Sequence, residues 1–152
     1  MAADVPYFDT SYLVRLYLRD HGFEAVRERA GSAASIASAW HAQAEITAAL
    51  HRSFREGRLQ QSVYLRALDQ FVSESNDGLF VWLPLTDPVQ QRVERFFQSA
   101  PANVFLRAAD ALHLACAAEH GYGEVYSHDR HFLAAAPLFG LRGVNVIGPE
   151  AR

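Results

Sequence analysis

The sequence predicts a three-layer α/β/α domain built on a short, mostly parallel sheet of five strands. Short apolar runs alternate with helix-like patterns along the chain, and no linker or repeat interrupts them. Strands that alternate with helices are typical of βαβ units, in which helices cover both faces of a parallel sheet. The 152 residues are about the size of one domain and half of them are apolar, so we expect a single domain over residues 1–152.

Five apolar runs are the expected strands. The clearest is residues 79–83, which ends at Pro84, and the others in chain order are residues 5–8, 35–37, 124–127 and 144–147. In open α/β sheets, ligands bind beyond the carboxyl ends of the strands. The residues that directly follow these runs are therefore where we expect chemistry.

Apolar residues at helical spacing predict the segments between the strands. The helix that opens at Asp87 has proline at its first helical position, and Gly57 and Gly121 fit the position just past a helix end. The expected helices cover residues 11–19, 39–56, 59–73, a segment from 87 onward, 106–120 and 130–136.

The composition excludes several kinds of chemistry. All 14 of the Lys and Arg residues are arginines, which excludes mechanisms that need a lysine amine, such as Schiff-base and P-loop chemistry. The single cysteine, Cys116, cannot form an internal disulfide or a cysteine-rich metal site. We see neither a secretory leader nor an apolar run long enough for a membrane span, and expect a cytoplasmic protein without a membrane partner.

Four acidic residues stand out by their positions. Asp9 and Asp129 follow expected strands, whereas Glu45 and Asp110 lie in helices among alanines and leucines. Carboxylates are seldom buried unless they are paired or bind a metal. Four converging carboxylates would repel one another, and two divalent cations would relieve that repulsion. Hard oxygen ligands favour Mg²⁺ or Mn²⁺, and such a site can activate a water for hydrolysis of a phosphodiester.

Each acid also has an ordinary structural interpretation. Asp9 and Asp129 could simply cap the helices that follow them. The two helical acids could form surface ion pairs, Glu45 with Arg52 and Asp110 with Arg107. His113, three residues after Asp110, could bond to that acid, although such a histidine is more often a packing residue.

The order and spacing of four segments resemble the PIN-domain family, and more narrowly VapC-like toxin ribonucleases of type II toxin–antitoxin systems. The first segment has Asp after the first strand, then Thr-Ser and an apolar helix, and the second has Glu within an Ala-rich helix. The third is Leu-Arg-Ala-Ala-Asp-Ala-Leu-His-Leu-Ala, and the fourth is Tyr-Ser-His-Asp-Arg-His-Phe. In chain order they are residues 7–17, 44–50, 106–115 and 126–132.

The resemblance implies an endoribonuclease that depends on Mg²⁺ or Mn²⁺, acts on RNA, forms a homodimer and is inhibited by a cognate antitoxin. Asp9, Glu45, Asp110 and Asp129 would form its acidic quartet, with Asp9 and Asp110 as the strongest metal ligands. The other two would complete the metal's surroundings or orient the nucleophile. Of the neighbouring polar residues, Ser127 would bond to a ligand carboxylate, and Thr10 and Ser11 would offer backbone N–H groups to phosphate.

The net charge of −3 by itself argues mildly against a nucleic-acid partner. If the four acids occupy a metal site, however, the 14 arginines face only 13 other acids. The rest of the surface would then be nearly neutral. Candidates for gripping RNA phosphates are Arg15, Arg19, Arg52, Arg55 and Arg58.

Two other functions remain open from the sequence. A catalytically idle PIN-fold module for RNA binding or protein interaction would need no cluster of four charges. A metal-dependent phosphatase of the haloacid dehalogenase type would need a second Asp two residues after the first, where this chain has Ser11.

Overall fold

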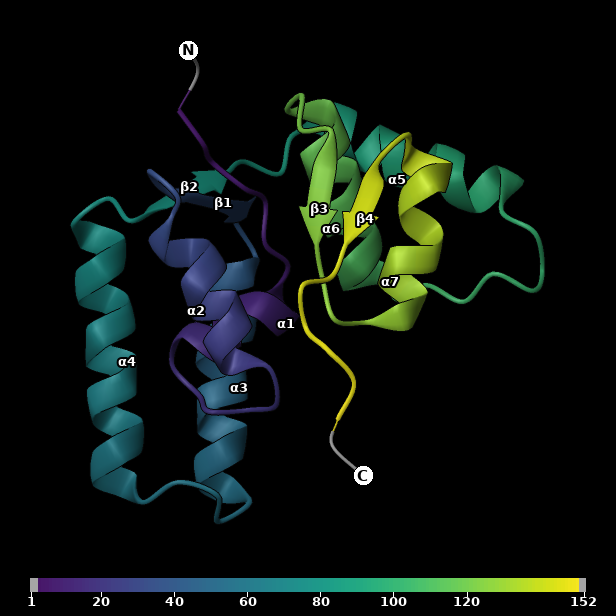
Figure 1. The fold of residues 1–152 in the computed structure, drawn as a ribbon. Coiled ribbons are helices and arrows are strands. Elements are labelled where there is room, and N and C mark those ends of the chain that lie inside the picture. The colour runs from purple at the N-terminus through teal and green to yellow at the C-terminus, as the bar shows by residue number, and fades with distance from the viewer. Residues whose placement is uncertain (1–2, 151–152) are drawn as a thin grey trace.

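A computed structural model describes residues 3–150 and shows a parallel α/β arrangement, as predicted (Figure 1). Strand β1 (Ile36–Ala39) pairs with β2 (Phe80–Leu83), and β3 (Glu124–Tyr126) pairs with β4 (Arg142–Val144), both in parallel. Residues 7–8 join the two pairs, because Tyr7 forms a parallel bridge to β1 and Phe8 forms one to β3. These two residues therefore occupy the centre of the strand order.

Residues 7–8, which we call the central segment, separate two apolar cores. Tyr7 and Phe8 point to opposite sides, as do Val125 and Tyr126 in β3, because successive side chains alternate across a strand. The core around Tyr7 is closed by α5 (Asp87–Ser99), α6 (Ala108–Glu119), α7 (Arg130–Ala135) and the short helix η2 (Ala136–Phe139).

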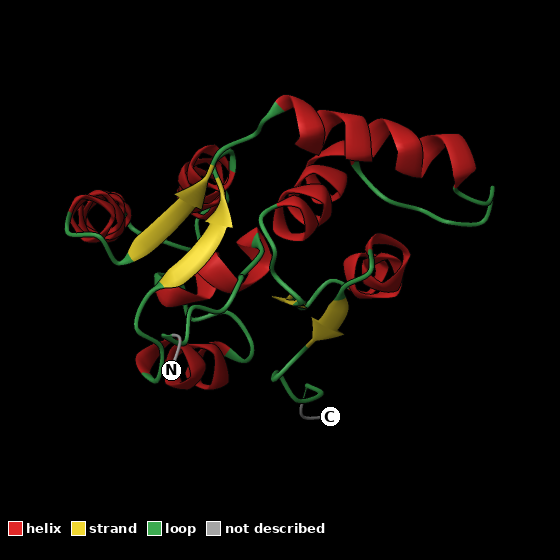
Figure 2. Ribbon diagram, turned by 90° about the horizontal axis from the view of Figure 1, so that it is seen from above, coloured by secondary structure: helices red, strands yellow, loops and turns green. Residues whose placement is uncertain are grey.

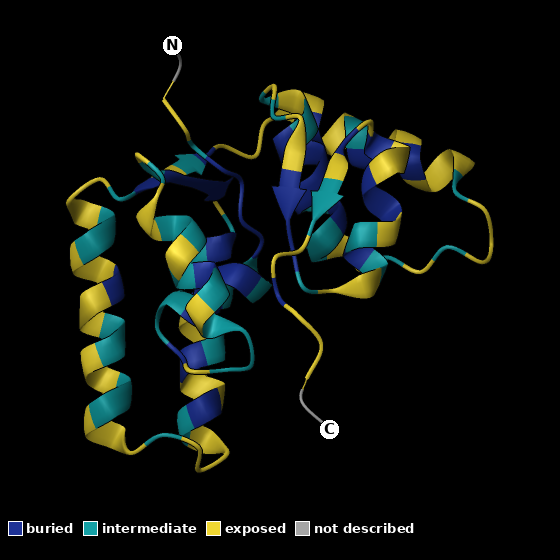
Figure 3. Cartoon of the chain, in the orientation of Figure 1, coloured by how far each residue is buried: buried dark blue, intermediate teal, exposed yellow. Residues whose placement is uncertain are grey.

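The core around Phe8 is closed by the remaining helices. These are α1 (Thr10–Leu13), η1 (Val14–Leu16), α2 (Phe23–Gly31), α3 (Ala42–Arg55) and α4 (Gln61–Asn76). Helices therefore lie on both sides of the strands, which is the predicted three-layer order (Figure 2). Burial is greatest in the central segment and β1, whereas α4 exposes much of its surface (Figure 3).

Several predicted boundaries were wrong. The expected strand at 144–147 lies instead at Arg142–Val144, and the first expected strand is reduced to single bridges at residues 7 and 8. The last strand passes so close to Leu133 of α7 that a side chain at Gly143 would collide with it. Glycine is unfavourable in the sequence pattern of a strand. For this reason the strand was predicted in the more apolar residues 144–147, beyond Gly143.

Two of the predicted helices also had wrong bounds. The helix expected at 11–19 is a single α-helical turn followed by the 3₁₀ turn η1, and α2 was not among the expected helices. The helix expected from residue 39 begins at Ala42, because the strand before it continues to Ala39. Within residues 3–150, no helix has both the length and the apolar character that a membrane span requires.

Candidate active site

Asp9 is held in place by both its backbone and its side chain. It directly follows the central segment, its backbone N–H donates to the carbonyl of Tyr126, and it is the N-cap residue of α1. Its carboxylate accepts hydrogen bonds from the hydroxyls of Ser11 (2.6 Å) and Ser127 (2.5 Å) and from the backbone N–H of Tyr12 (3.1 Å). Burial raises the pKa of Asp9, although these donors oppose the rise. The capping interpretation is thus confirmed, but capping leaves part of the carboxylate free.

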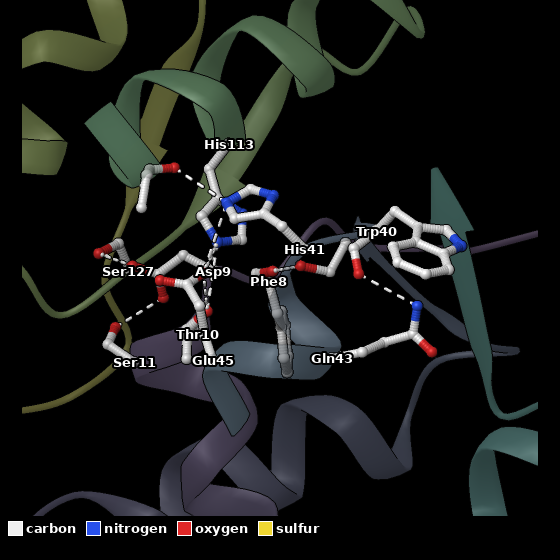
Figure 4. A network of polar contacts seen from close by, with 12 residues as sticks. Phe8, Asp9, Thr10, Ser11, Trp40, His41, Gln43, Glu45, His113 and Ser127 are labelled. Atoms are coloured by element: carbon white, nitrogen blue, oxygen red, sulfur yellow. Dashed lines mark hydrogen bonds and ion pairs between the residues drawn. The ribbon is translucent and has the colours of Figure 1, made fainter. Parts of the chain in front are cut away.

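Glu45 lies in the first turn of α3, and its carboxylate faces the side chains of Thr10, His41 and His113 (Figure 4). Its Oε1 accepts from the Thr10 hydroxyl at 2.8 Å and lies 2.8 Å from Nε2 of His113 and 3.4 Å from Nε2 of His41. Burial opposes ionisation, but His113 and Thr10 outweigh it and hold the pKa of Glu45 below its usual value. The pairing with Arg52 that the sequence allowed is not found among the described residues.

Asp110, in the first turn of α6, is half-buried, and its surroundings disfavour its charge. Burial raises its pKa to about 6, and the charges of Asp9, Asp129 and Glu45 add to the rise, while His113 opposes it. The other three acids therefore all act on this carboxylate. The alternative pairing with Arg107 is not found within residues 3–150.

Asp129 caps α7 and is exposed. Its carboxylate accepts from the backbone N–H of Phe132 at 2.9 Å, and its own N–H donates to the Ser127 hydroxyl at 3.0 Å. The same hydroxyl donates to Asp9, so Ser127 connects two of the four acids. The charges of Asp9, Asp129 and Glu45 all act on Asp110, and we call these four residues the acidic cluster. Within residues 3–150, no three of them bring their carboxylate oxygens within 4.8 Å of one another.

Thr10, Ser11 and Ser127, the predicted polar neighbours, donate hydrogen bonds to these acids through their side chains. Besides Asp9, the Ser11 hydroxyl contacts the backbone N–H of His128 at 3.0 Å, which ties the loop after β3 to α1. The Thr10 hydroxyl donates to Glu45. The backbone role that the sequence suggested for Thr10 and Ser11 stays a prediction.

The chemistry of the donor set fits a divalent cation. Among the described residues, the carboxylate of Asp110 accepts no hydrogen bond, and neither do Oε2 of Glu45 and Oδ2 of Asp129. Oδ2 of Asp9 accepts only one, and each carboxylate oxygen has two lone pairs. Every acid of the cluster therefore keeps an oxygen available, and oxygen is the ligand that Mg²⁺ and Mn²⁺ prefer.

Histidines beside the cluster were only partly foreseen. His113 is buried and contacts Glu45, not Asp110 as the sequence suggested. His41 does not stand out in the sequence, although it lies four residues before Glu45 and hence on the same side of the chain. Ligand atoms of His41, Glu45 and His113 all lie within 4.8 Å of one another.

One sequence-based candidate for RNA contact was wrong. Arg15 is buried, and its guanidinium donates to the carbonyls of Ser11 and His21, so it stabilises the turn after α1. Arg58 pairs with Glu56. Arg19 and Arg52 are exposed.

Asp9 and Asp129 lie beyond strand ends of a parallel α/β arrangement, which is where ligands bind in open α/β folds. The chain belongs to the PIN-domain family, whose sequence model matches residues 7–137. A search of curated proteins gave no match to the sequence.

Solved structures share the fold at low sequence identity. A FitAcB structure from Neisseria gonorrhoeae is 19% identical with a TM-score of 0.71, and covers 93% of this chain and 98% of its own. VapC20 from Mycobacterium tuberculosis, described as a sarcin–ricin loop cleaving toxin, is 18% identical with a TM-score of 0.65, over 85% of this chain and 93% of its own. VapBC2 from Rickettsia felis, bound to a promoter DNA fragment, is 13% identical with a TM-score of 0.63, over 93% and 98%.

Proposed function

We propose that this chain is a toxin endoribonuclease that hydrolyses RNA phosphodiester bonds with the help of Mg²⁺ or Mn²⁺. The observation that carries the proposal is that Asp9, Glu45 and Asp129 lie near enough to Asp110 for their charges to act on its half-buried carboxylate, whose pKa burial already raises. A carboxylate in such surroundings is stabilised by a cation, and groups with strongly perturbed pKa values are typical of functional sites.

Asp9 and Asp110 would hold the ion directly, with Glu45 and Asp129 at its edge. A divalent cation there would supply a more acidic water and offset the charge that develops on a phosphate during hydrolysis. The chain itself holds the carboxylates in position. Ser11 and Ser127 fix the orientation of Asp9, and Thr10 fixes that of Glu45. Since PIN-fold VapC20 is described as cleaving the sarcin–ricin loop, an RNA, we take RNA as the substrate class.

The direct test is cleavage of total RNA by the wild-type chain and by Asp110→Asn and Asp9→Asn. We expect each variant to lose at least about a hundredfold in rate, since a lost metal ligand removes charge stabilisation at the transition state. Asp87→Asn is the matched control, because Asp87 is an exposed acid in the first turn of another helix, α5, and should keep full activity.

The proposed nuclease and the catalytically idle PIN-fold module predict different results. Undiminished Mg²⁺-dependent cleavage by both variants would falsify the proposal. If the wild type neither cleaves RNA nor binds Mn²⁺ in calorimetry, the chain is an idle PIN-fold module instead.

The same proposal includes an inhibitory antitoxin partner. A shallow groove of about 780 Å³ runs along α3 and α4, lined by Trp40, Gln43, Ala44, Thr47, Ala48, His51, Tyr64 and Phe71. Small side chains on one wall and aromatic rings on the other suit an amphipathic helix of a partner protein. VapBC2 shares this fold, as does a FitAB structure bound to an IR36 DNA fragment, which is 16% identical with a TM-score of 0.60. Their resemblance to this chain supports an antitoxin partner here.

A homodimer is also part of the proposal. Trp40, with 61% of its surface exposed, lies beside Pro84 and Leu85 where β1 and β2 end. We call these three residues the Trp40 patch. Exposed apolar patches commonly mark protein contacts, and here we assign the contact to a second copy of the chain. Trp40 then lies at the boundary between this dimer contact and the antitoxin groove, which it also lines. The cytoplasm, where RNA is found, is the compartment that agrees with this function.

A further inference from the structure

A buried chain of polar contacts leads from Tyr7 to the acidic cluster. The Tyr7 hydroxyl lies 2.7 Å from Nδ1 of His113, and Nε2 of the same ring lies 2.8 Å from Oε1 of Glu45. The two aromatic rings meet edge to face with centroids 5.9 Å apart. A side chain of the central segment thus contacts a histidine of α6, and that histidine contacts a carboxylate on α3. Figure 4 shows the second of these contacts, between His113 and Glu45.

Burial and packing leave the histidine ring little freedom. Tyr7 is fully buried and His113 is 1% exposed. The ring of His41 covers one side of His113 at a centroid distance of 4.4 Å, and Phe132 packs against it at 6.3 Å. A glutamate side chain has several rotatable bonds, so ordering it costs side-chain entropy. Contact with a rigid ring restricts Glu45 before any ligand binds.

The partners of His113 indicate where its ring carries a proton. Nε2 faces Oε1 of Glu45 at 2.8 Å and the Thr10 oxygen at 3.2 Å. A carboxylate only accepts hydrogen bonds, so a bare lone pair on Nε2 would repel it, whereas an N–H there donates to it. Nδ1 can then accept from the Tyr7 hydroxyl, and both ring nitrogens are satisfied.

We propose that Tyr7 and His113 are positioning residues that hold Oε1 of Glu45, so that Oε2 stays free and oriented toward the other acids of the cluster. This rests on the proposed function, because it assigns Glu45 a role at the cation. The arrangement corresponds to the partners that orient ligands around metal sites, whose loss typically weakens metal affinity or activity 10- to 100-fold.

The test is a double-mutant cycle on RNA cleavage and Mn²⁺ affinity, the latter measured by calorimetry. His113→Leu should lower kcat about tenfold or more and weaken Mn²⁺ binding similarly, with an unchanged KM for RNA. His113→Gln should recover most of both, because its amide can place an N–H donor near the position of Nε2. In a Glu45→Gln background, His113→Leu should have no further effect, since the group on which it acts is already changed.

Two outcomes of the cycle would overturn the proposal. One is an equal effect of His113→Leu with and without Glu45→Gln, which a merely structural histidine would give. The other is an unchanged Mn²⁺ affinity and rate in His113→Leu or in Glu45→Gln. Circular dichroism of each variant separates these results from a loss of fold.

A second measurement does not depend on nuclease activity. Nitrogen-15 NMR of the histidine side chains in the full chain should show a proton on Nε2 of His113, and Tyr7→Phe should shift the Nδ1 resonance by removing its donor. A ring without a proton on Nε2 would overturn the positioning chain. If instead the expected spectrum is found in a wild type that neither binds Mn²⁺ nor cleaves RNA, the proposed function fails while the contact chain stands.

Discussion

Ser127 donates a hydrogen bond of 2.5 Å to Oδ2 of Asp9, across a separation of 118 residues in the sequence. Its oxygen also accepts from the backbone N–H of Asp129. One buried hydroxyl therefore sets the distance between the end of the central segment and the start of α7. Two acids of the cluster depend on it.

Ser127→Ala tests this connection. Removing the hydroxyl leaves Asp9 with two donors in place of three, so we expect about a tenfold loss of Mn²⁺ affinity, with a parallel loss of cleavage rate. Calorimetry measures the affinity. Ser53→Ala is the matched control, because Ser53 is buried and its hydroxyl has no partner among residues 3–150. That change should leave metal binding intact, and an equal loss in both variants would contradict the role of Ser127.

Asp110→Asn should stabilise the metal-free protein above pH 6. The folded-state pKa of Asp110 is about 6 and the unfolded value is near 3.8, so the folded state binds more protons between these values. The stability of the wild type therefore falls as pH rises from about 4 to 6, and the penalty persists at higher pH. Because Asp110 is partly exposed, we discount the effect and expect a gain of about 2–4 °C in Tm.

Thermal unfolding in EDTA at pH 4 and at pH 7.5 measures the difference. The two proteins should unfold at similar temperatures at pH 4, because Asp110 is protonated in the folded state and is close to its unfolded-state pKa of 3.8, so little of the penalty has developed. Added Mn²⁺ should raise the Tm of the wild type more than that of the variant. A variant less stable than the wild type at pH 7.5 in EDTA would contradict the electrostatic account.

Gly22→Ala should destabilise the fold by about 2–4 kcal/mol. Gly22 begins α2 with a positive φ of 81°, and an added Cβ would collide with the side chain of Ile147. Gly57→Ala is the control, because Gly57 has a similar φ of 77° but open space around it, so only the backbone strain of about 1–2 kcal/mol applies. Urea unfolding of both variants gives the difference, which reports how firmly Ile147 packs against α2.

Leu85→Glu should convert the proposed dimer into a monomer. A charge placed in the Trp40 patch would lose its hydration in a dimer contact, which is unfavourable. Light scattering after gel filtration gives the mass of each variant. The control is Leu138→Glu, since Leu138 is also exposed but lines a different hollow, beside Phe96 and Phe139. If Leu85→Glu stays dimeric, or if the wild type is monomeric, the Trp40 patch is not the dimer contact.

The sequence predicted the class of fold because alternation is a local property. The run at residues 79–83 and the helix that opens at Asp87 were evident from apolar spacing and from proline. Strands of three or four residues, such as β4, carry too little pattern for firm bounds, and pairing partners far along the chain decide where they begin and end. The central segment is an extreme case, since its strand character consists of one bridge on each side.

The candidate site was predicted in outline and not in detail. Asp9 and Asp129 could be found because each comes within a few residues of the end of an expected strand, and Asp110 and Glu45 because charge is unusual among alanines. The contact of Glu45 with His113 was not foreseen, because it joins two helices whose relative placement no local pattern specifies. The same reason explains why Arg15 was wrongly assigned to the surface, since its carbonyl partners depend on how the chain turns after α1.

The position of residues 7–8 between the two strand pairs has a consequence for synthesis of the chain. This segment leaves the ribosome well before Tyr126, one of its two bridge partners, because more than a hundred residues separate them. Pairings of such long range form late in folding. A ribosome-bound chain that has not yet reached Asp129 cannot complete the acidic cluster, so any activity that needs all four acids is withheld until translation has passed this residue.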